Sequence, residues 1–519
     1  MASRPLLVAL LLVALITAVR LTGTVDSDVA WQLWIAGRMH DGAVLYRDII
    51  ETNPPLWFWM AVPVERAAAL LHVRIESALI VTIGGLGALS LAATSRFLSH
   101  VEPSRQTVFL CASAIMLCAM PWMHVGQREQ IVMIGALPYA ALIAARRDGH
   151  RVPTIFALAI GIGGALGFAL KHYFLIVPAL LELLLLSGQG RRWRLRRPET
   201  LAMAGVGALY AIAVLLFAGD FLTSIVPLLR LSYGGLGAPN FLHLLRPFGA
   251  VGLILLIVSL AHAKELRKAP FALALFTAAI GFAAAYFIQH KGWPYHTIPM
   301  IGFAGLAIVA LLLKSTSPLR LLRLGAPGLL CLPLLLAAEE QLHPALPNPD
   351  LRLAVAQLRT GDTVGFLATE TAIPWSVTLQ GGYGYASRYN GFWMLPAVMR
   401  NEALGGPNPR LTALGGQVVA ETVHDFACAR PRRIIISRPR PGEPGFDILA
   451  FFRRDPRFVE LLSHYRVVGR TTFETYELSD PVLTGSHGPL PAVRCDSILN
   501  HAADRTRPVQ SDVALAPRG

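Results

Sequence analysis

Long apolar runs recur along the first two thirds of the chain, and short polar loops separate them. Runs of this length are sufficient to cross the ~30 Å hydrocarbon core of a bilayer. The alternation therefore predicts an α-helical polytopic membrane bundle. The predicted membrane segments are 5–23, 54–72, 77–95, 107–123, 129–146, 153–170, 173–189, 200–218, 248–263, 270–289, 297–314 and 324–338.

The pattern changes near residue 340, where proline, glycine, aspartate and arginine become common. Alternating stretches such as "TVGFLA", "RRIIIS" and "FETYEL" are typical of strands. We therefore predict a membrane domain over residues 1–339 and a soluble α/β domain over residues 340–480. The last residues, 481–519, are rich in Pro, Arg, Ser and Asp, and we expect a poorly ordered tail there.

Composition agrees with a membrane protein. The chain has 519 residues, of which 54% are hydrophobic and only 15% are charged. Its mean hydropathy is +0.52, whereas a soluble protein carries about 25% charged residues. The first apolar run is similar to a secretory signal, but further spans follow it, so we interpret it as a retained first helix.

The formal net charge of +14 suggests nucleic-acid binding at first sight. The basic residues cluster instead in short loops between apolar runs, which is the positive-inside signature of membrane orientation. We therefore predict no nucleic-acid partner. The basic loops lie at 146–151, 191–197, 264–268 and 314–323.

The charge of the loops and the number of membrane crossings together predict how the chain is oriented. If the basic loops face the cytoplasm, the intervening loops and residue 340 onwards face the periplasm of a bacterial inner membrane. Twelve full crossings from an N-terminus inside would return the C-terminus to the inside, so one segment must not cross. Segment 54–72 is the candidate, because Pro63, Glu65 and Arg66 interrupt its apolar stretch. We predict about eleven spans plus a short or re-entrant helix at 54–72.

Charged residues gather in the loops assigned to the outer face. Asp26 and Asp28 follow directly on the first segment, where charge close to hydrocarbon is costly unless it is hydrated or functional. The chain has only five lysines, and Lys171 and Lys291 fall in outer loops, where positive charge is disfavoured. The alternatives are a solvated loop for the acids and snorkelling to the interface for the lysines.

The residues "VAWQLWIAGRMHDG" after Asp28 predict an amphipathic helix in the membrane interface. Its broad apolar face includes Trp31 and Trp34, which we expect at headgroup depth. Asp28 is a good N-cap for this helix. The helix start would therefore fix both carboxylates beside the membrane.

Acids in one loop and cations in several others fit the chemistry of a lipid-linked phosphate. Such a phosphate is anionic and lies at the membrane interface. It needs cations to hold it and to stabilise it as a leaving group. A neighbouring carboxylate would deprotonate an incoming hydroxyl as a general base.

Short motifs follow one another in an order similar to that of a known family. An aspartate follows the first span, "G..LYRD" ends the juxtamembrane helix, and "NPPL" opens the short helix. Arg74 then precedes a span, and Gln127–Glu129 opens another. The segments "LGFALKHYFLIVP", "KGWPYHTIP" and "GYASRYNGFWMLP", the last at 384–396, continue the match. In this order of motifs the chain resembles the GT-C superfamily of polytopic glycosyltransferases, which includes the protein O-mannosyltransferases and the aminoarabinose transferases of lipid A.

The resemblance implies an inverting sugar transfer from a polyprenyl-phosphate carrier, with an aspartate of the first outer loop as base. It also implies an acceptor on the periplasmic face, which would be an envelope glycan, a lipid or a protein. The family's two acids are commonly adjacent, whereas Ser27 separates Asp26 from Asp28 here, so either one remains a candidate base. Asn53 stands where the family often has Lys or His, which places more of the phosphate binding on the other cations.

The candidate site residues fall into three groups. The catalytic acids are Asp26 and Asp28. The donor phosphate-binding cations are Lys171, Lys291, Arg74 and Arg128, and the pocket residues are Asn53, Tyr295, His296, His290 and Arg388. No cofactor or metal ligand is firmly predicted, although a divalent cation is compatible with a phosphate site.

Two other classes of function remain open at this point. A glycolipid transporter or flippase predicts two-sided access and internal pseudo-symmetry, whereas the polar residues cluster on one side and we find no repeat. A membrane-embedded phosphatase or ligase would need its own basic and histidine constellation, and the outer acids would be expendable. The sequence does not specify the sugar, the acceptor or the oligomeric state.

Cys428 and Cys495 are the only two of the five cysteines predicted to lie outside the membrane. The outer side of a bacterial inner membrane is oxidising. A disulfide between these two cysteines and a pair of free thiols are both open from the sequence.

Overall fold

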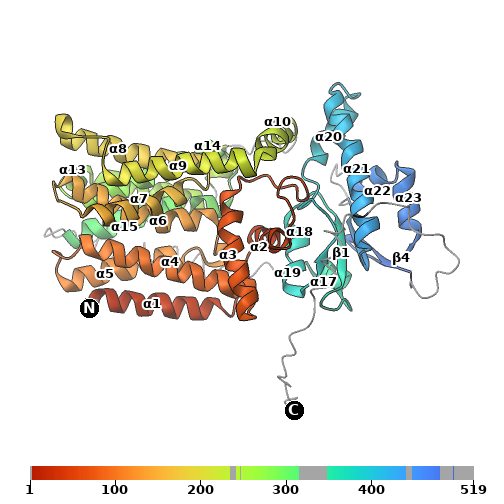
Figure 1. The fold of residues 1–519 in the computed structure, drawn as a ribbon, viewed down its shortest axis with the longest axis horizontal. Helices are drawn as coiled ribbons and strands as arrows, with labels where there is room; N and C mark the ends of the chain where they lie inside the picture. The colour runs from red at the N-terminus through yellow and green to blue at the C-terminus, as the bar shows by residue number, and fades with distance from the viewer. Residues whose placement is uncertain are drawn as a thin grey trace, which may run out of the picture.

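The computed structural model describes residues 3–233, 241–245, 247–314, 348–439, 447–479 and 495. Figure 1 shows a helical bundle with a smaller α/β domain at one end, and the N-terminus at the other end of the bundle. The predicted fold class, a helical membrane bundle with a C-terminal α/β domain, is confirmed. The boundary near residue 340 lies outside the described residues, as does the predicted tail apart from Cys495.

The bundle helices follow the predicted apolar segments closely. Every predicted segment within the described residues is helical, and 324–338 lies outside them. Five helices of the described chain are long and apolar enough to cross a membrane, so the predicted number of spans stays a prediction. The long bundle helices are α1 (Arg4–Arg20), α4 (Ile75–Phe97), α5 (Pro103–Ala114), α6 (Arg128–Arg147), α7 (Thr154–Phe168), α8 (Ile176–Gln189), α9 (Pro198–Phe217), α12 (Pro247–Ala261), α14 (Pro270–Gln289) and α15 (Ile298–Lys314).

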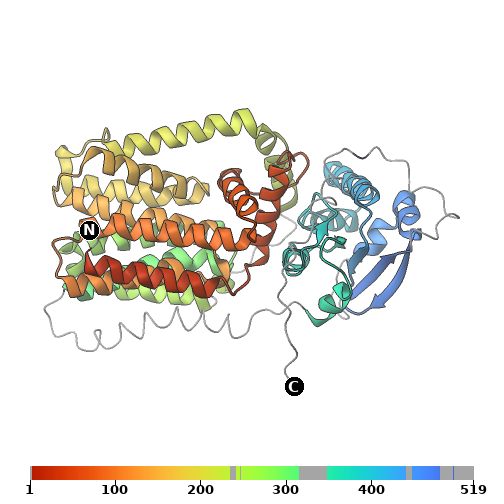
Figure 2. The same ribbon diagram turned by 60° about the horizontal axis from the view of Figure 1, so that its bottom comes forward.

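Helix α3 (Leu56–Leu71) lies across the end of the bundle rather than along it (Figures 1 and 2). It ends at His72, which adopts a left-handed conformation with φ 52°. Pro63 lies inside the helix, so the helix is longer than the uninterrupted apolar stretch suggested. That segment 54–72 does not cross the membrane stays a prediction.

Helix α2 (Ser27–His40) lies between the bundle and the soluble domain (Figure 2). Its N-cap is Asp26, which accepts a hydrogen bond from Val29 N at 2.9 Å, so the predicted cap at Asp28 was wrong by two residues. The expected headgroup position of Trp31 was also wrong. Trp31 is buried, and its ring lies 5.0 Å from both Trp34 and Trp375. The soluble domain therefore covers this apolar face of α2, and the contact between them excludes water.

The region 219–247 was expected to be an outer loop, but its described residues are largely helical. It contains a π-helical turn, η5 (Phe221–Ile225), and the helices α10 (Val226–Ser232) and α11 (Phe241–Leu244). Helix α10 packs on the soluble domain, where the rings of Tyr233 and Trp393 lie 5.5 Å apart. A short helix, α13 (Ala263–Arg267), also occupies one of the basic loops.

The soluble domain is built on a five-stranded sheet with strand order β2-β1-β3-β5-β4. Strands β1 and β3 pair in parallel, and β5 joins them antiparallel. The predicted strands correspond to β1 (Thr363–Leu367), β3 (Arg433–Ser437) and β5 (Phe473–Leu478), and the sequence analysis missed β2 (Gly384–Tyr385) and β4 (Tyr465–Arg470). The helices of this domain are α17 (Pro349–Val355), α18 (Ala372–Trp375), α19 (Thr378–Gly381), α20 (Leu395–Ala403), α21 (Pro409–Ala429), α22 (Ile448–Phe452) and α23 (Pro456–Ser463).

One disulfide and one backbone contact fix the ends of this domain. Cys428, in the last turn of α21, is bonded to Cys495, so the structure selects the disulfide over free thiols. Towards the bundle, Ile50 N donates a hydrogen bond of 2.8 Å to Arg388 O, beside an isolated bridge between Ile50 and Tyr389. The loop before α3 is therefore joined directly to the sheet domain.

We predict that the chain segments before and after α3 lie on the same face of the membrane. Val44 and Val73 are both exposed and flank α3, while Ser104 opens α5 beyond the next long helix. In a cysteine-free background, Val44→Cys and Val73→Cys should react with an impermeant thiol reagent on spheroplasts, and Ser104→Cys should react only after lysis. Opposite accessibility of positions 44 and 73 would mean that α3 crosses and would contradict this topology.

Candidate active site

The first turn of α6 brings three polar side chains into the bundle. Gln127, Arg128 and Glu129 are each at most 3% exposed, although they begin a helix that packs among apolar neighbours. The turn is fixed from two sides. Gln130 accepts a hydrogen bond from Gly126 N at 2.7 Å and donates one to Leu117 O at 2.8 Å.

The contact with Leu117 falls in a π-helical turn, η1 (Ile115–Ala119), which continues α5. Such turns often lie next to functional sites. On the other side, Trp57 of α3 donates its indole N–H to Gly126 O at 2.8 Å. Gly126 has φ +84° and its Cβ would clash with Leu79, so glycine is required at this point. The start of α6 is therefore rigid before any ligand binds.

The two acids after the first helix have different surroundings. Asp26 caps α2, lies 2.7 Å from His124 Nδ1 and accepts from Gln127 Nε2 at 3.2 Å. Asp28 accepts one side-chain hydrogen bond, from the Tyr295 hydroxyl at 3.1 Å. Asp26 is thus occupied with holding the helix and its neighbours, and Asp28 is the acid with oxygen lone pairs available for a substrate.

The protonation equilibrium of Asp28 also distinguishes it. Burial raises the pKa of Asp28 to about 6, and the negative charge of Asp26 adds to the rise. The charge of Arg128 and the hydrogen bond from Tyr295 act in the opposite direction. A carboxyl group with a pKa just below neutrality is suited to accept a proton at physiological pH.

A buried ion pair lies next to these acids. Lys171 Nζ donates to Glu129 Oε1 at 2.5 Å and lies 3.1 Å from His296 Nε2. Glu129 is fully buried, and only 11% of the Lys171 side chain is exposed. Burial lowers the pKa of Lys171, and the carboxylate of Glu129 opposes that change. The Lys171 side chain therefore does not snorkel to the membrane interface, because its ammonium points inward to Glu129.

Arg128 differs from Lys171 because it lacks a matching carboxylate. Its guanidinium is buried, and Nε and Nη1 have no hydrogen-bond partner within the described chain. Gln127 Oε1 and Glu129 Oε2 are unsatisfied in the same way. Buried polar atoms without partners are rare in native proteins and require an explanation. Their position beside Asp28 indicates a polar ligand, and the two free nitrogens of Arg128 indicate that this ligand is anionic.

Glu51 was not assigned a role from the sequence, although it directly precedes "TNPPL". It is buried and accepts from Trp31 Nε1 at 2.5 Å and from Asn53 N at 2.7 Å. Asn53 also donates its side-chain amide to Glu51, and its carbonyl accepts from the Tyr46 hydroxyl at 2.6 Å. Glu51 therefore ties α2 to the start of α3, and Asn53 supports this loop rather than extending freely into a pocket.

The structure brings together six of the eleven predicted site residues by contacts among their side chains or by a charge interaction with Asp28, and a seventh, Lys291, interacts by charge with His296. The six are Asp26, Asp28, Arg128, Lys171, Tyr295 and His296. The rings of Tyr295 and His296 lie 4.5 Å apart, and Tyr295 also faces His124 at 5.4 Å. The sequence analysis named Gln127–Glu129 only as the opening of a span, and it gave His124, Gln127 and Glu129 no role. Their proximity in the chain to Arg128 was the signal that could have assigned them to the site.

The remaining predicted residues lie in other contacts. The Lys291 ammonium is 4.2 Å from the Tyr233 ring centroid, and burial lowers the pKa of Lys291. Arg74 is 65% exposed in its side chain and pairs with Glu76 at 2.6 Å. His290 ends α14 with φ 50°.

Arg388 belongs to the soluble domain and does not contribute a free cation. Its side chain binds Asp425 at 2.7 Å, and its backbone N–H donates to the same carboxylate at 2.9 Å. Arg388 therefore fixes the loop that contacts Ile50. Within the described chain, no group of three or more His, Cys, Asp or Glu side chains has an arrangement that could hold a metal ion.

No family model matches the chain, and no curated protein matches it. Among solved structures, the crystal structure of ArnT from Cupriavidus metallidurans bound to undecaprenyl phosphate is similar, with 14% sequence identity and a TM-score of 0.48. The match covers 91% of this chain and 98% of that chain. A likeness at this level does not identify an activity, so the function must be argued from the residues of this chain.

The buried pair of Glu129 and Lys171 should show strong energetic coupling. Glu129→Gln leaves a buried ammonium without its counter-charge, and we expect the free energy of unfolding to fall by about 3–5 kcal/mol. Glu129→Gln/Lys171→Met should recover most of this loss. Thermal unfolding of the purified protein in detergent measures both changes. Arg47→Gln is the control, because Arg47 and Asp220 form an exposed pair that should contribute at most about 1 kcal/mol. An unaltered unfolding temperature in Glu129→Gln would contradict the coupling.

Proposed function

We propose that the chain is a membrane glycosyltransferase that transfers a sugar from a polyprenyl-phosphate carrier to an acceptor hydroxyl, with inversion at the anomeric carbon. One observation carries the proposal. A carboxyl group with a pKa of about 6, Asp28, lies within electrostatic range of Arg128, a buried guanidinium with two unpaired nitrogens. An acid suited to take a proton and a cation suited to hold an anion are the two groups that such a transfer needs.

Asp28 acts as the general base in this proposal. Its ionised carboxylate accepts the proton of the acceptor hydroxyl while that oxygen attacks the anomeric carbon of the sugar. Tyr295 orients the carboxylate through its hydrogen bond. Asp26 keeps the start of α2 in place through Val29, His124 and Gln127, and is therefore a positioning residue.

Arg128 receives the charge that develops on the leaving group. As the new glycosidic bond forms, the bond between the anomeric carbon and the phosphate oxygen breaks, and the polyprenyl phosphate leaves with an additional negative charge. The planar guanidinium can bind a phosphate through two parallel hydrogen bonds. Lys171 adds positive charge nearby, but its direct contact is with Glu129, so Arg128 is the primary phosphate ligand.

The position of the site suits a lipid-linked donor. The site lies at the end of an apolar bundle next to the soluble domain, where a long isoprenoid tail can remain in the membrane while the sugar phosphate meets the acids. We place this face in the periplasm, because the basic loops at the other end favour the cytoplasm. The acceptor in this proposal is an envelope glycan, lipid or protein.

We predict that Asp28→Asn abolishes transfer while Asp26→Asn weakens it less. Loss of the general base should lower the rate by at least ~10²-fold, whereas Asp26→Asn keeps an oxygen acceptor for the helix cap. A deletion strain complemented with each variant is the test. Mass spectrometry of envelope glycans and of polyprenyl-phosphate sugars should show lost product and accumulated donor for Asp28→Asn.

The pH profile provides a second readout for the same residue. With a pKa of about 6, Asp28 is ionised above pH 6 and protonated below it. Transfer in membrane vesicles should therefore fall roughly tenfold per pH unit below pH 6, as expected for a single required base. Wild-type transfer by Asp28→Asn, or a rate independent of pH between 5 and 7, would exclude Asp28 as the base.

We predict that Arg128→Gln weakens binding of the donor phosphate. The variant keeps a shorter hydrogen-bonding side chain but loses the charge, and a charge-assisted bidentate contact is stronger than a neutral one. Titration of purified protein with a polyprenyl phosphate should show at least roughly tenfold weaker binding. Arg47→Gln, which removes an exposed arginine already paired with Asp220, is the matched control. Equal affinity in Arg128→Gln and wild type would remove Arg128 from the phosphate site.

A further inference from the structure

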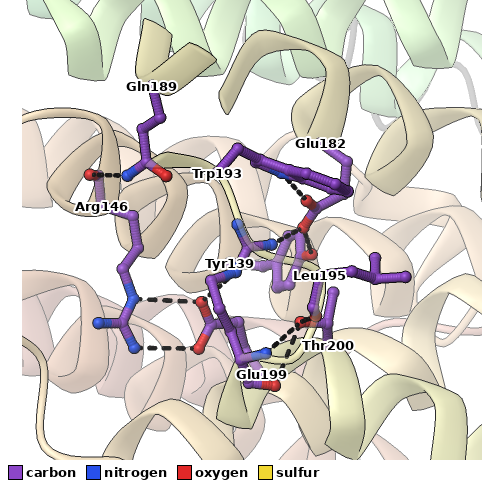
Figure 3. A network of polar contacts seen from close by, with 9 residues as sticks. Tyr139, Arg146, Glu182, Gln189, Trp193, Leu195, Glu199 and Thr200 are labelled. Atoms are coloured by element: carbon purple, nitrogen blue, oxygen red, sulfur yellow. Dashed lines mark hydrogen bonds and ion pairs between the residues drawn. The ribbon is translucent and has the colours of Figure 1, made fainter. Parts of the chain in front are cut away.

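The end of the bundle opposite the candidate site carries a second group of buried charges. Helix α6 runs from Arg128 at the site to Arg146 at this end. Arg146 binds Glu199 through two parallel hydrogen bonds, each 3.1 Å long. Figure 3 shows this pair, and Glu199 is fully buried at the start of α9.

A second acid in this group, Glu182 of α8, holds the loop between α8 and α9. Glu182 accepts from Trp193 Nε1 at 3.2 Å and also binds Arg197. The Tyr139 hydroxyl of α6 lies 3.3 Å from the same carboxylate (Figure 3). Trp193 and Arg197 therefore point inward, and they fix the loop "RRWRLRR" at two positions.

The other arginines of this loop point outward. Four of them, Arg191, Arg192, Arg194 and Arg196, are exposed, and none forms a hydrogen bond or an ion pair through its side chain with the described residues. The backbone between them is also held, because Leu195 O accepts from the Thr200 hydroxyl at 2.6 Å. The loop thus presents four unneutralised cations on a fixed backbone.

Helix α9 supplies an apolar surface directly beside these cations. It runs along the outside of the bundle in both ribbon views (Figures 1 and 2), and only Glu199 and Val214 of its residues are buried. Its large apolar side chains face outward along the helix: Leu201, Leu209, Ile212, Leu215, Leu216 and Phe217. Cations at the helix start and hydrocarbon along its length match the two parts of a phospholipid.

We propose that the loop at residues 190–197 is a binding site for anionic diacyl phospholipids, with the headgroup on the four arginines and the acyl chains along α9. Clusters of basic residues next to a membrane helix attract anionic headgroups, and each cation contributes to the affinity. Arginine suits this role because its guanidinium binds phosphate in two directions at once and is weakly hydrated. The inference is independent of the proposed transfer, since it uses no residue of the candidate active site.

The inward contacts of Glu182 and Glu199 explain why the loop is a defined site for an anionic headgroup rather than a general positive surface. Without Glu182 and Glu199, the seven-residue loop would have five mobile arginines that repel one another. The two acids neutralise Arg197 and Arg146 and direct the remaining cations to the same side. A fixed arrangement loses less conformational entropy on binding than a flexible one.

Native mass spectrometry of the purified full chain tests this site. Titration with dioleoyl phosphatidylglycerol should show tight binding to wild type, and dioleoyl phosphatidylcholine should bind more weakly. In Arg191→Gln/Arg192→Gln/Arg194→Gln/Arg196→Gln, the affinity for phosphatidylglycerol should fall by at least roughly tenfold, with the affinity for phosphatidylcholine unchanged. The corresponding fourfold lysine variant should keep most of the binding, because it keeps the charge.

The matched control removes four exposed arginines from the soluble domain instead: Arg352, Arg359, Arg410 and Arg466. This variant, again with glutamine, should bind phosphatidylglycerol as wild type does. Glycerol phosphate, which has the charge but no acyl chains, should not compete at equal concentration. Wild-type affinity in the loop variant, an equal loss in the control, or full competition by glycerol phosphate would overturn the proposal.

Discussion

The fold depends on the desolvation of Arg128 and Glu129 at the first turn of α6. Charged side chains lose several kcal/mol of hydration when they are buried, so each needs a partner. Glu129 obtains Lys171 and His296 from two other segments, which forces the loops at 171–175 and 294–297 to meet at α6. Arg128 obtains no such partner from the described residues. The described residues therefore supply a counter-charge for Glu129 and none for Arg128.

The soluble domain contributes to the site indirectly, through α2. The ring of Trp31 contacts Trp375 of the sheet domain while its indole N–H binds Glu51. Asp28 lies one turn earlier on the same helix, so the domain, the loop before α3 and the acid are linked through a few side chains. Aromatic contacts of this kind add about 0.5–1.5 kcal/mol beyond area burial. Displacement of the domain would consequently move the acid relative to Arg128.

The sequence predicted the bundle well because membrane helices have a simple physical signature: an apolar run of fixed length between charged loops. It also drew attention to Asp26, Asp28, Lys171 and Lys291, since charge at those positions is anomalous, and it left the choice between the two acids open. It did not predict which charges neutralise one another, so Lys171 was expected to bind phosphate and is instead paired with Glu129. It placed Trp31 in the headgroup region because the contact with Trp375 joins segments far apart in the chain, and local amphipathicity cannot distinguish a lipid from a protein partner.

Helix α6 connects two regions in which buried charge is treated differently. At its last turn Arg146 is matched by Glu199 with two hydrogen bonds. At its first turn the guanidinium of Arg128 has two free nitrogens. A channel or transporter must hydrate or open both ends in turn, whereas the last turn of α6 is held by the ion pair of Arg146 with Glu199. This difference between the two ends of α6 is the reason why the proposed chemistry is placed at the end of Arg128.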